Sequence, residues 1–142
     1  KNEKILENSL LAEKKLDIFL DQITDKHILK YENLALVGFS QGSMMAIQVS
    51  LKKKEKINCV IGYSGKIINK KNLSESINSK PKIFLMHGAD DTIVSPTCLL
   101  EAKEFLNIHG FKIKTKIFKD CEHKITAEAS SLGLEFLKKN LL

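Results

Sequence analysis

LALVGFSQG, residues 34–42, is the stretch of this 142-residue chain that decides its fold. Its first four residues are continuously apolar, which is typical of a strand covered on both faces. Residues 41–54 then favour a helix whose lysine-rich end suits the negative pole of the helix dipole. A G-x-S-x-G turn therefore stands between a predicted strand and a predicted helix. We expect its two glycines to let the backbone turn sharply and expose the Ser40 hydroxyl at the positive end of that helix.

Strands and helices continue to alternate on both sides of this stretch. Before it, residues 3–23 mix charges with spaced apolar side chains, which predicts a helix. After it, we expect strands at 58–63, 83–86 and 112–117, and helices from Ser95-Pro96 to His109-Gly110 and from 126 to 141. Residues 64–79 are polar and predict no regular structure. The alternation predicts an α/β fold of three layers, α/β/α, with a mainly parallel sheet. Alternate lysines in the strand 112–117 are typical of a guarded sheet edge.

Three side chains suited to nucleophilic catalysis each follow a predicted strand. Ser40 follows the first strand, Asp91 the strand 83–86, and His123 the strand 112–117. A serine hydroxyl needs a base and an orienting acid, and α/β enzymes of this kind carry them in the order Ser, acid, His. Because the carboxyl ends of parallel strands meet at one edge of a sheet, we expect the three to converge there. The backbone N–H of Gln41 would then be one of two oxyanion donors.

Other interpretations of the polar residues stay open at this stage. The G-x-S-x-G pentapeptide alone is weak evidence without its strand–turn–helix setting. Asp90 adjoins Asp91, and the residues by themselves do not exclude it as the acid. A metal site is conceivable but would leave the serine turn unexplained; its ligands would be His87, Asp90, Asp91 and His123. Among the other histidines, His27 precedes the serine, His109 ends a helix, and His87 begins a glycine turn and favours a structural role.

Composition argues against several classes of protein. All 23 basic residues are lysine, the net charge is +6, and only 6% of residues are aromatic. Without arginine forks or stacking platforms, we expect no nucleic-acid partner. No apolar run approaches the length of a membrane span. The three cysteines, Cys59, Cys98 and Cys121, lack metal-like spacing, which favours a reducing cytoplasm.

At these residues the chain resembles the phospholipase/carboxylesterase family, which includes the acyl-protein thioesterases. The segments that carry the resemblance are GFSQG at 38–42, GYSG at 62–65, HGADDTIVSP at 87–96 and Glu122-His123. In the family's H-G-x-x-D-x-x-V pattern the acid falls on Asp91, and the base before the last helix falls on His123. The resemblance implies an α/β-hydrolase that cleaves carboxylic esters or acyl thioesters through an acyl-enzyme. Ser40 would be the nucleophile, and no metal or organic cofactor is needed.

The chain also departs from the family pattern. Ser43 stands where the family usually has a glycine, which is a mild change. Family members begin with several strands before this chain's first helix, and one carries an L-H-G-x-G loop with the second oxyanion donor. The resemblance thus implies that residues 1–142 are a single domain, the C-terminal part of a truncated α/β-hydrolase fold. The strand Leu34–Val37 would be an exposed edge, and we expect it to pair with a second copy or with an N-terminal fragment.

Two other functions are compatible with the same residues. A catalytically impaired fragment or pseudoenzyme would keep the triad and act by binding, or by pairing with a missing N-terminal segment. A peptidase or a lactone hydrolase could use the same fold. The GFSQG and YSG segments favour the esterase.

Overall fold

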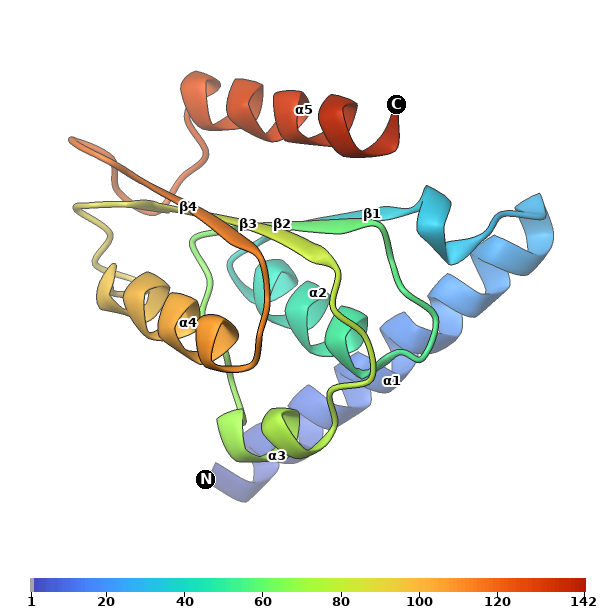
Figure 1. The fold of residues 1–142 in the computed structure, drawn as a ribbon. Helices are drawn as coiled ribbons and strands as arrows, with labels where there is room; N and C mark the ends of the chain where they lie inside the picture. The colour runs from blue at the N-terminus through green and yellow to red at the C-terminus, as the bar shows by residue number, and fades with distance from the viewer. Residues whose placement is uncertain (1) are drawn as a thin grey trace.

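The computed structural model describes residues 2–142 as a parallel four-stranded sheet between helices (Figure 1). The strands lie in the order β1-β2-β3-β4, and each pairs in parallel with its neighbours. They are β1 (Ala35–Phe39), β2 (Cys59–Tyr63), β3 (Lys82–Gly88) and β4 (Ile113–Phe118). One face carries α1 (Asn2–His27), α2 (Gln41–Lys52), α3 (Lys70–Glu75) and α4 (Thr97–Ile108), and the other carries α5 (Ala127–Leu141). This confirms the predicted three-layer α/β class.

Two of the three buried apolar clusters lie on opposite faces of the sheet. All of β2 and all of β3 except Lys82 are buried, as their continuous apolar runs predict. Side chains alternate across a strand, so Val60 and Ile83 pack toward α2 and α4 while Ile61 and Phe84 pack toward α5. The covered strands therefore form a rigid platform for the loops at their carboxyl ends.

One helix was not predicted, α1 ends at His27 and not at the predicted residue 23, and the other helix ends lie within two residues of expectation. Residues 64–79 contain the short helix α3, which the polar sequence did not predict. Its anchor is Leu73, a single fully buried side chain, and one apolar residue gives no periodic signal. At the end of α4, Gly110 has φ +79°, the left-handed stop that was predicted. Thr126 caps α5 by accepting a hydrogen bond from the Ala129 N–H at 3.1 Å.

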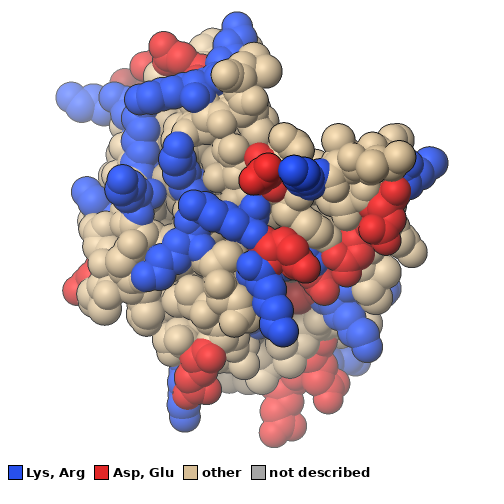
Figure 2. Space-filling view, turned by 45° about the vertical axis from the view of Figure 1, so that its right-hand side comes forward, with Lys and Arg blue, Asp and Glu red and all other residues tan. Residues whose placement is uncertain are grey.

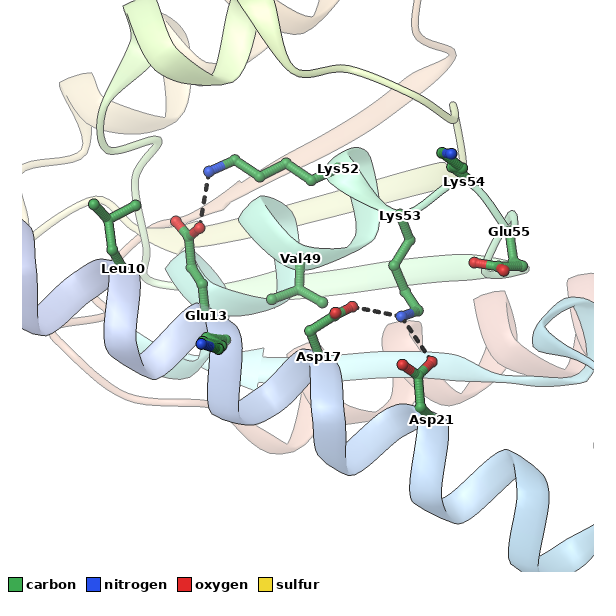
Figure 3. Close-up of a pocket in the computed structure, with 10 residues that line it drawn as sticks. Leu10, Glu13, Asp17, Asp21, Val49, Lys52, Lys53, Lys54 and Glu55 are labelled. Carbon is green, nitrogen blue, oxygen red and sulfur yellow. Dashed lines mark hydrogen bonds and ion pairs between the residues drawn. The ribbon is translucent and has the colours of Figure 1, made fainter.

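Ion pairs hold α1 against the end of α2 (Figure 3). The buried Lys53 ammonium lies 2.5 Å from Asp17 Oδ1 and 3.1 Å from Asp21 Oδ1, and Lys52 lies 2.8 Å from Glu13 Oε2. Burial alone would lower the pKa of Lys53, but its hydrogen bonds to the aspartates outweigh burial and raise the pKa. The groove between the two helices is lined by four lysines and four carboxylates, so its charges balance internally. We therefore assign it to helix docking rather than to ligand binding.

The apolar positions of α1 are largely exposed. Leu6, Leu10, Leu11, Ile18 and Phe19 are each between 41% and 52% exposed. The pattern correctly predicted a helix, but most of these side chains face away from the rest of residues 2–142. An exposed apolar surface of this kind is typical of a site that contacts a partner.

Charged side chains are spread over the surface. In Figure 2, lysines cover much of the left of the view, while Asp and Glu gather toward the right and below. β4 is an outer strand with Lys114 and Lys116 exposed, as predicted for a guarded edge. Among residues 2–142, no helix combines the length and apolarity needed to cross a membrane.

Candidate active site

Ser40 occupies the turn between β1 and α2 in a strained backbone conformation. Its φ is +55° and its ψ is −117°, which L-residues rarely adopt, and its N–H donates to the Tyr63 carbonyl at 2.8 Å. The side chain stands at the N-terminus of α2, where the first backbone N–H groups, including that of Gln41, lack intrahelical partners. Strained turns of this type expose a nucleophile at a positive helix end.

The two glycines of the turn have different roles. A Cβ on Gly38 would lie 2.3 Å from the Gly42 carbonyl carbon and 2.5 Å from Ser43 N, so only glycine fits there. A Cβ on Gly42 would meet nothing within 4 Å. The expectation that both glycines shape the turn is therefore wrong for Gly42, because α2 leaves open space around it.

Replacing Gly38 by alanine is expected to lower the free energy of unfolding by about 1 to 3 kcal/mol, since the backbone of the turn must move. The matched variant Gly42→Ala is expected to be neutral, or to stabilise by up to about 1 kcal/mol, because alanine is the better helix former. Urea-induced unfolding of both variants measures the difference. Equal stabilities for the two variants would contradict the assignment of the close contact to Gly38.

Ser40, His123 and Asp91 form one hydrogen-bonded chain. The distance from Ser40 Oγ to His123 Nε2 is 3.1 Å, and that from His123 Nδ1 to Asp91 Oδ2 is 2.7 Å. The Asp91 side chain is fully buried and that of His123 is 17% exposed. The ring of Phe39 packs against His123 with centroids 4.8 Å apart, a contact that the sequence did not indicate. The three predicted residues thus meet at the carboxyl edge of the sheet.

Backbone donors fix Asp91 in its turn. Its Oδ1 accepts hydrogen bonds from the N–H groups of Ile93 and Val94, both at 2.9 Å. Burial alone would raise the pKa of Asp91, but the hydrogen bonds from His123, Val94 and Ile93 lower the pKa below its ordinary value. The neighbouring Asp90 is exposed, and the side-chain hydrogen bonds of His123 in the described structure go to Asp91 and Ser40. Geometry therefore distinguishes two adjacent carboxylates that, in the sequence, only the family pattern distinguished.

The loops after β3 and β4 are packed directly on one another. A Cβ on Gly88 would lie 2.2 Å from the Cys121 carbonyl oxygen and 2.3 Å from that of Glu122. The Asp90 N–H also donates to the Cys121 carbonyl at 2.9 Å. The glycine of the H-G-x-x-D pattern therefore lets the loop of His123 approach the loop of Asp91.

The serine at position 43 fills the space behind the turn. Ser43 is 1% exposed, and its Oγ would lie 2.4 Å from a Cβ on Gly62 and 2.5 Å from one on Gly65. Glycine is thus required at both ends of the GYSG segment, because the Ser43 side chain occupies the space that a Cβ would need. The predicted mild change at Ser43 is accommodated without displacing Ser40.

The other histidines lie outside this chain of hydrogen bonds. His27 is exposed at the end of α1, and His109 Nδ1 lies 2.8 Å from the Phe105 carbonyl at the end of α4. His87 is buried, with Nε2 3.3 Å from Asp91 Oδ2; the sequence suggested that these two residues could lie close together only through the metal-site alternative. Across residues 2–142, no three His, Cys, Asp or Glu side chains are arranged to hold a metal ion.

Chemically, this arrangement can generate a nucleophile. His123 can accept the Ser40 proton through Nε2, because Asp91 holds the proton of its Nδ1. The N-terminus of α2 can stabilise a negative charge that develops beside Ser40. The attack of a serine on an acyl carbonyl requires both features.

Comparisons with known proteins agree with the α/β fold described above. A family model described as phospholipase/carboxylesterase matches residues 2–141. Esterase YpfH of Escherichia coli is 27% identical over 104 residues, covering 73% of this chain and 44% of the relative. Acyl-protein thioesterase 1 of Saccharomyces cerevisiae is 30% identical over 129 residues, covering 84% and 55%. The crystal structure of esterase PE8 matches with a TM-score of 0.91 and 31% identity, covering 94% and 62%. The chain thus spans about half the length of the curated relatives it matches.

Proposed function

The chain belongs to the phospholipase/carboxylesterase family, and from that premise we propose that it is a serine hydrolase of small carboxylic esters or acyl thioesters. The E. coli and yeast relatives are named an esterase and an acyl-protein thioesterase. Both reactions transfer an acyl group to water. The observation that carries the proposal is the hydrogen-bonded chain from Ser40 through His123 to Asp91.

The residues of the Ser40–His123–Asp91 triad divide the steps of the proposed reaction among them. Ser40 attacks the acyl carbonyl while His123 takes its proton, and the N–H of Gln41 binds the oxyanion. His123 then returns the proton to the leaving alcohol or thiol, and the acyl-enzyme forms. In the second half of the reaction His123 activates water, which releases the acid. Asp91 holds the imidazole in the required tautomer throughout.

Labelling by a fluorophosphonate probe tests the proposal. The probe is expected to modify the chain on one residue, Ser40, as identified by mass spectrometry of the digested protein. Labelling should be faster than that of free serine because the hydroxyl is activated. A folded chain that does not label, or that labels elsewhere, would contradict the proposal and favour a binding role for the same site.

We place the protein in the cytoplasm. The support is its cysteine chemistry: Cys59, Cys98 and Cys121 are all free thiols, and two of them are buried. Thiols persist in a reducing compartment. The proposal is tested by fractionation of cells that produce the protein.

We also propose that the outer edge of β1 pairs with another strand. β1 is an outer strand of the sheet, and Val37 and Phe39 on it are 54% and 39% exposed. The exposed apolar side chains of α1 form a separate uncovered surface on the other face of the sheet. An apolar strand edge of this kind is a template for a further strand, either from a second copy or from a separate N-terminal segment.

Sedimentation velocity is expected to show dimers or larger species of the isolated chain. Replacing Val37 by lysine should shift the distribution toward monomer, because a charge on an outer strand blocks edge-to-edge pairing. Ile108→Lys, which adds the same charge at an exposed position at the end of α4, is the control for the change in net charge. A chain that stays monomeric at every concentration would contradict self-association.

A further inference from the structure

His87 is a buried histidine of β3 that the proposed reaction does not use. It is 2% exposed, and its Nε2 lies 2.8 Å from the Val94 carbonyl oxygen and 3.3 Å from Asp91 Oδ2. Carbonyl and carboxylate oxygens can only accept a hydrogen bond. The Nε2 atom of His87 must therefore carry the hydrogen.

The contacts of Val94 connect His87 to the candidate acid. The Val94 N–H donates to Asp91 Oδ1, and the Val94 carbonyl accepts from His87. His87 belongs to a central strand and pairs in register with Ile117 of β4. The imidazole thus fastens the far end of the Asp91 turn to the rigid sheet.

The two imidazoles approach the same carboxylate oxygen. His123 Nδ1 lies 2.7 Å from Asp91 Oδ2 and His87 Nε2 lies 3.3 Å from it. Lys66 lines the same small cavity as His87 and is exposed. Asp90, on the same loop as Asp91, is exposed. The hydrogen bond of His87 Nε2–H goes to the Val94 carbonyl, and Nε2 lies 3.3 Å from Asp91 Oδ2, so the positive end of this N–H group lowers the negative potential at the oxygen that His123 contacts.

We propose that His87 is a positioning residue: its Nε2–H holds the Asp91 turn through the Val94 carbonyl and lies beside Asp91 Oδ2, the oxygen that His123 contacts. The inference rests on the proposed hydrolase function. In this proposal His87, the histidine of the H-G-x-x-D pattern, influences His123 through Asp91 and does not contact the substrate.

The test compares two variants in the rate and pH dependence of fluorophosphonate labelling. His87→Leu removes the donor, and the rate is expected to fall about tenfold because Asp91 is less well placed. The acid limb of its pH profile should move to higher pH, since Asp91 then attracts protonated His123 more strongly. His87→Gln keeps an N–H at a similar distance and should restore most of the rate and the wild-type profile.

A matched control separates this role from general effects of losing a histidine. His109 also contacts a backbone carbonyl but lies at the end of α4, so His109→Leu is expected to label like the wild type. Thermal unfolding of every variant ensures that only folded protein is compared. A folded His87→Leu variant with the wild-type rate and pH profile would overturn the proposal. A slower rate without a shifted acid limb and without rescue by glutamine would also overturn it.

A second readout does not depend on activity. Long-range ¹H–¹⁵N spectra of the wild-type protein should show the His87 hydrogen on Nε2, and a hydrogen on Nδ1 alone would contradict the inference. A wild-type chain that does not label would contradict the hydrolase function itself. Failure of the His87 inference can therefore be distinguished from failure of the hydrolase function.

Discussion

Replacing Ser40 by alanine is expected to lower ester hydrolysis about a million-fold, the loss typical of removing the nucleophile of a triad. No other hydroxyl or thiol lies within hydrogen-bonding distance of His123 Nε2 in the described structure, where Ser40 Oγ is 3.1 Å away. The turn should keep its shape, because alanine meets the same backbone strain as serine at φ +55°. Steady-state hydrolysis of a short-chain aryl ester and of an acyl thioester, with active protein counted by probe labelling, measures the loss.

Ser43 provides the matched control. It lies three residues further along α2, is 1% exposed, and its Oγ has no hydrogen-bond partner within residues 2–142. Ser43→Ala removes a hydroxyl from the same helix without touching His123, so activity is expected to remain within a few-fold of wild type. A Ser40→Ala variant that keeps a hundredth of the activity would mean that a different group is the nucleophile.

The sequence predicted the strands and the meeting of the three residues for the same physical reason. Strands covered on both faces are continuously apolar, and β2 and β3 are buried almost throughout. Once those strands are located, parallel pairing brings the residues after them to one edge. Ser40, Asp91 and His123 could therefore be brought together without knowledge of any contact.

Features that depend on contacts between distant residues could not be predicted. The choice of Asp91 over Asp90 came from the family pattern and not from the residues themselves, because which of two adjacent carboxylates turns inward depends on the path of the loop. The place of His87 beside Asp91 depends on the path of the turn up to Val94. The exposure of Leu11 and Phe19 likewise escaped prediction, because a helical pattern indicates an apolar face but not what covers it.

Replacing Asp91 by asparagine is expected to lower the turnover number about ten-thousand-fold while leaving the fold intact. The N–H groups of Ile93 and Val94 both donate to Oδ1, so the amide oxygen must take that position. The amide NH₂ then faces His123 Nδ1, which must accept and become unprotonated. The remaining proton moves to Nε2, so Nε2 can no longer accept the proton of Ser40.

Asp90→Asn is the matched control, because it changes the same charge one residue earlier on an exposed side chain. Its turnover should stay close to wild type, and a large loss there would shift the role of the acid to Asp90.

The pH dependence of stability adds a second check on Asp91. Since the pKa of Asp91 is lowered from 3.8, its ionised form stabilises the fold fully above pH 3.8, and this stabilisation is lost as pH falls through the lower folded value. Unfolding measured against pH should therefore show wild type and Asp91→Asn converging in acid, and a gap that persisted there would mean that the carboxylate charge is not what holds the turn.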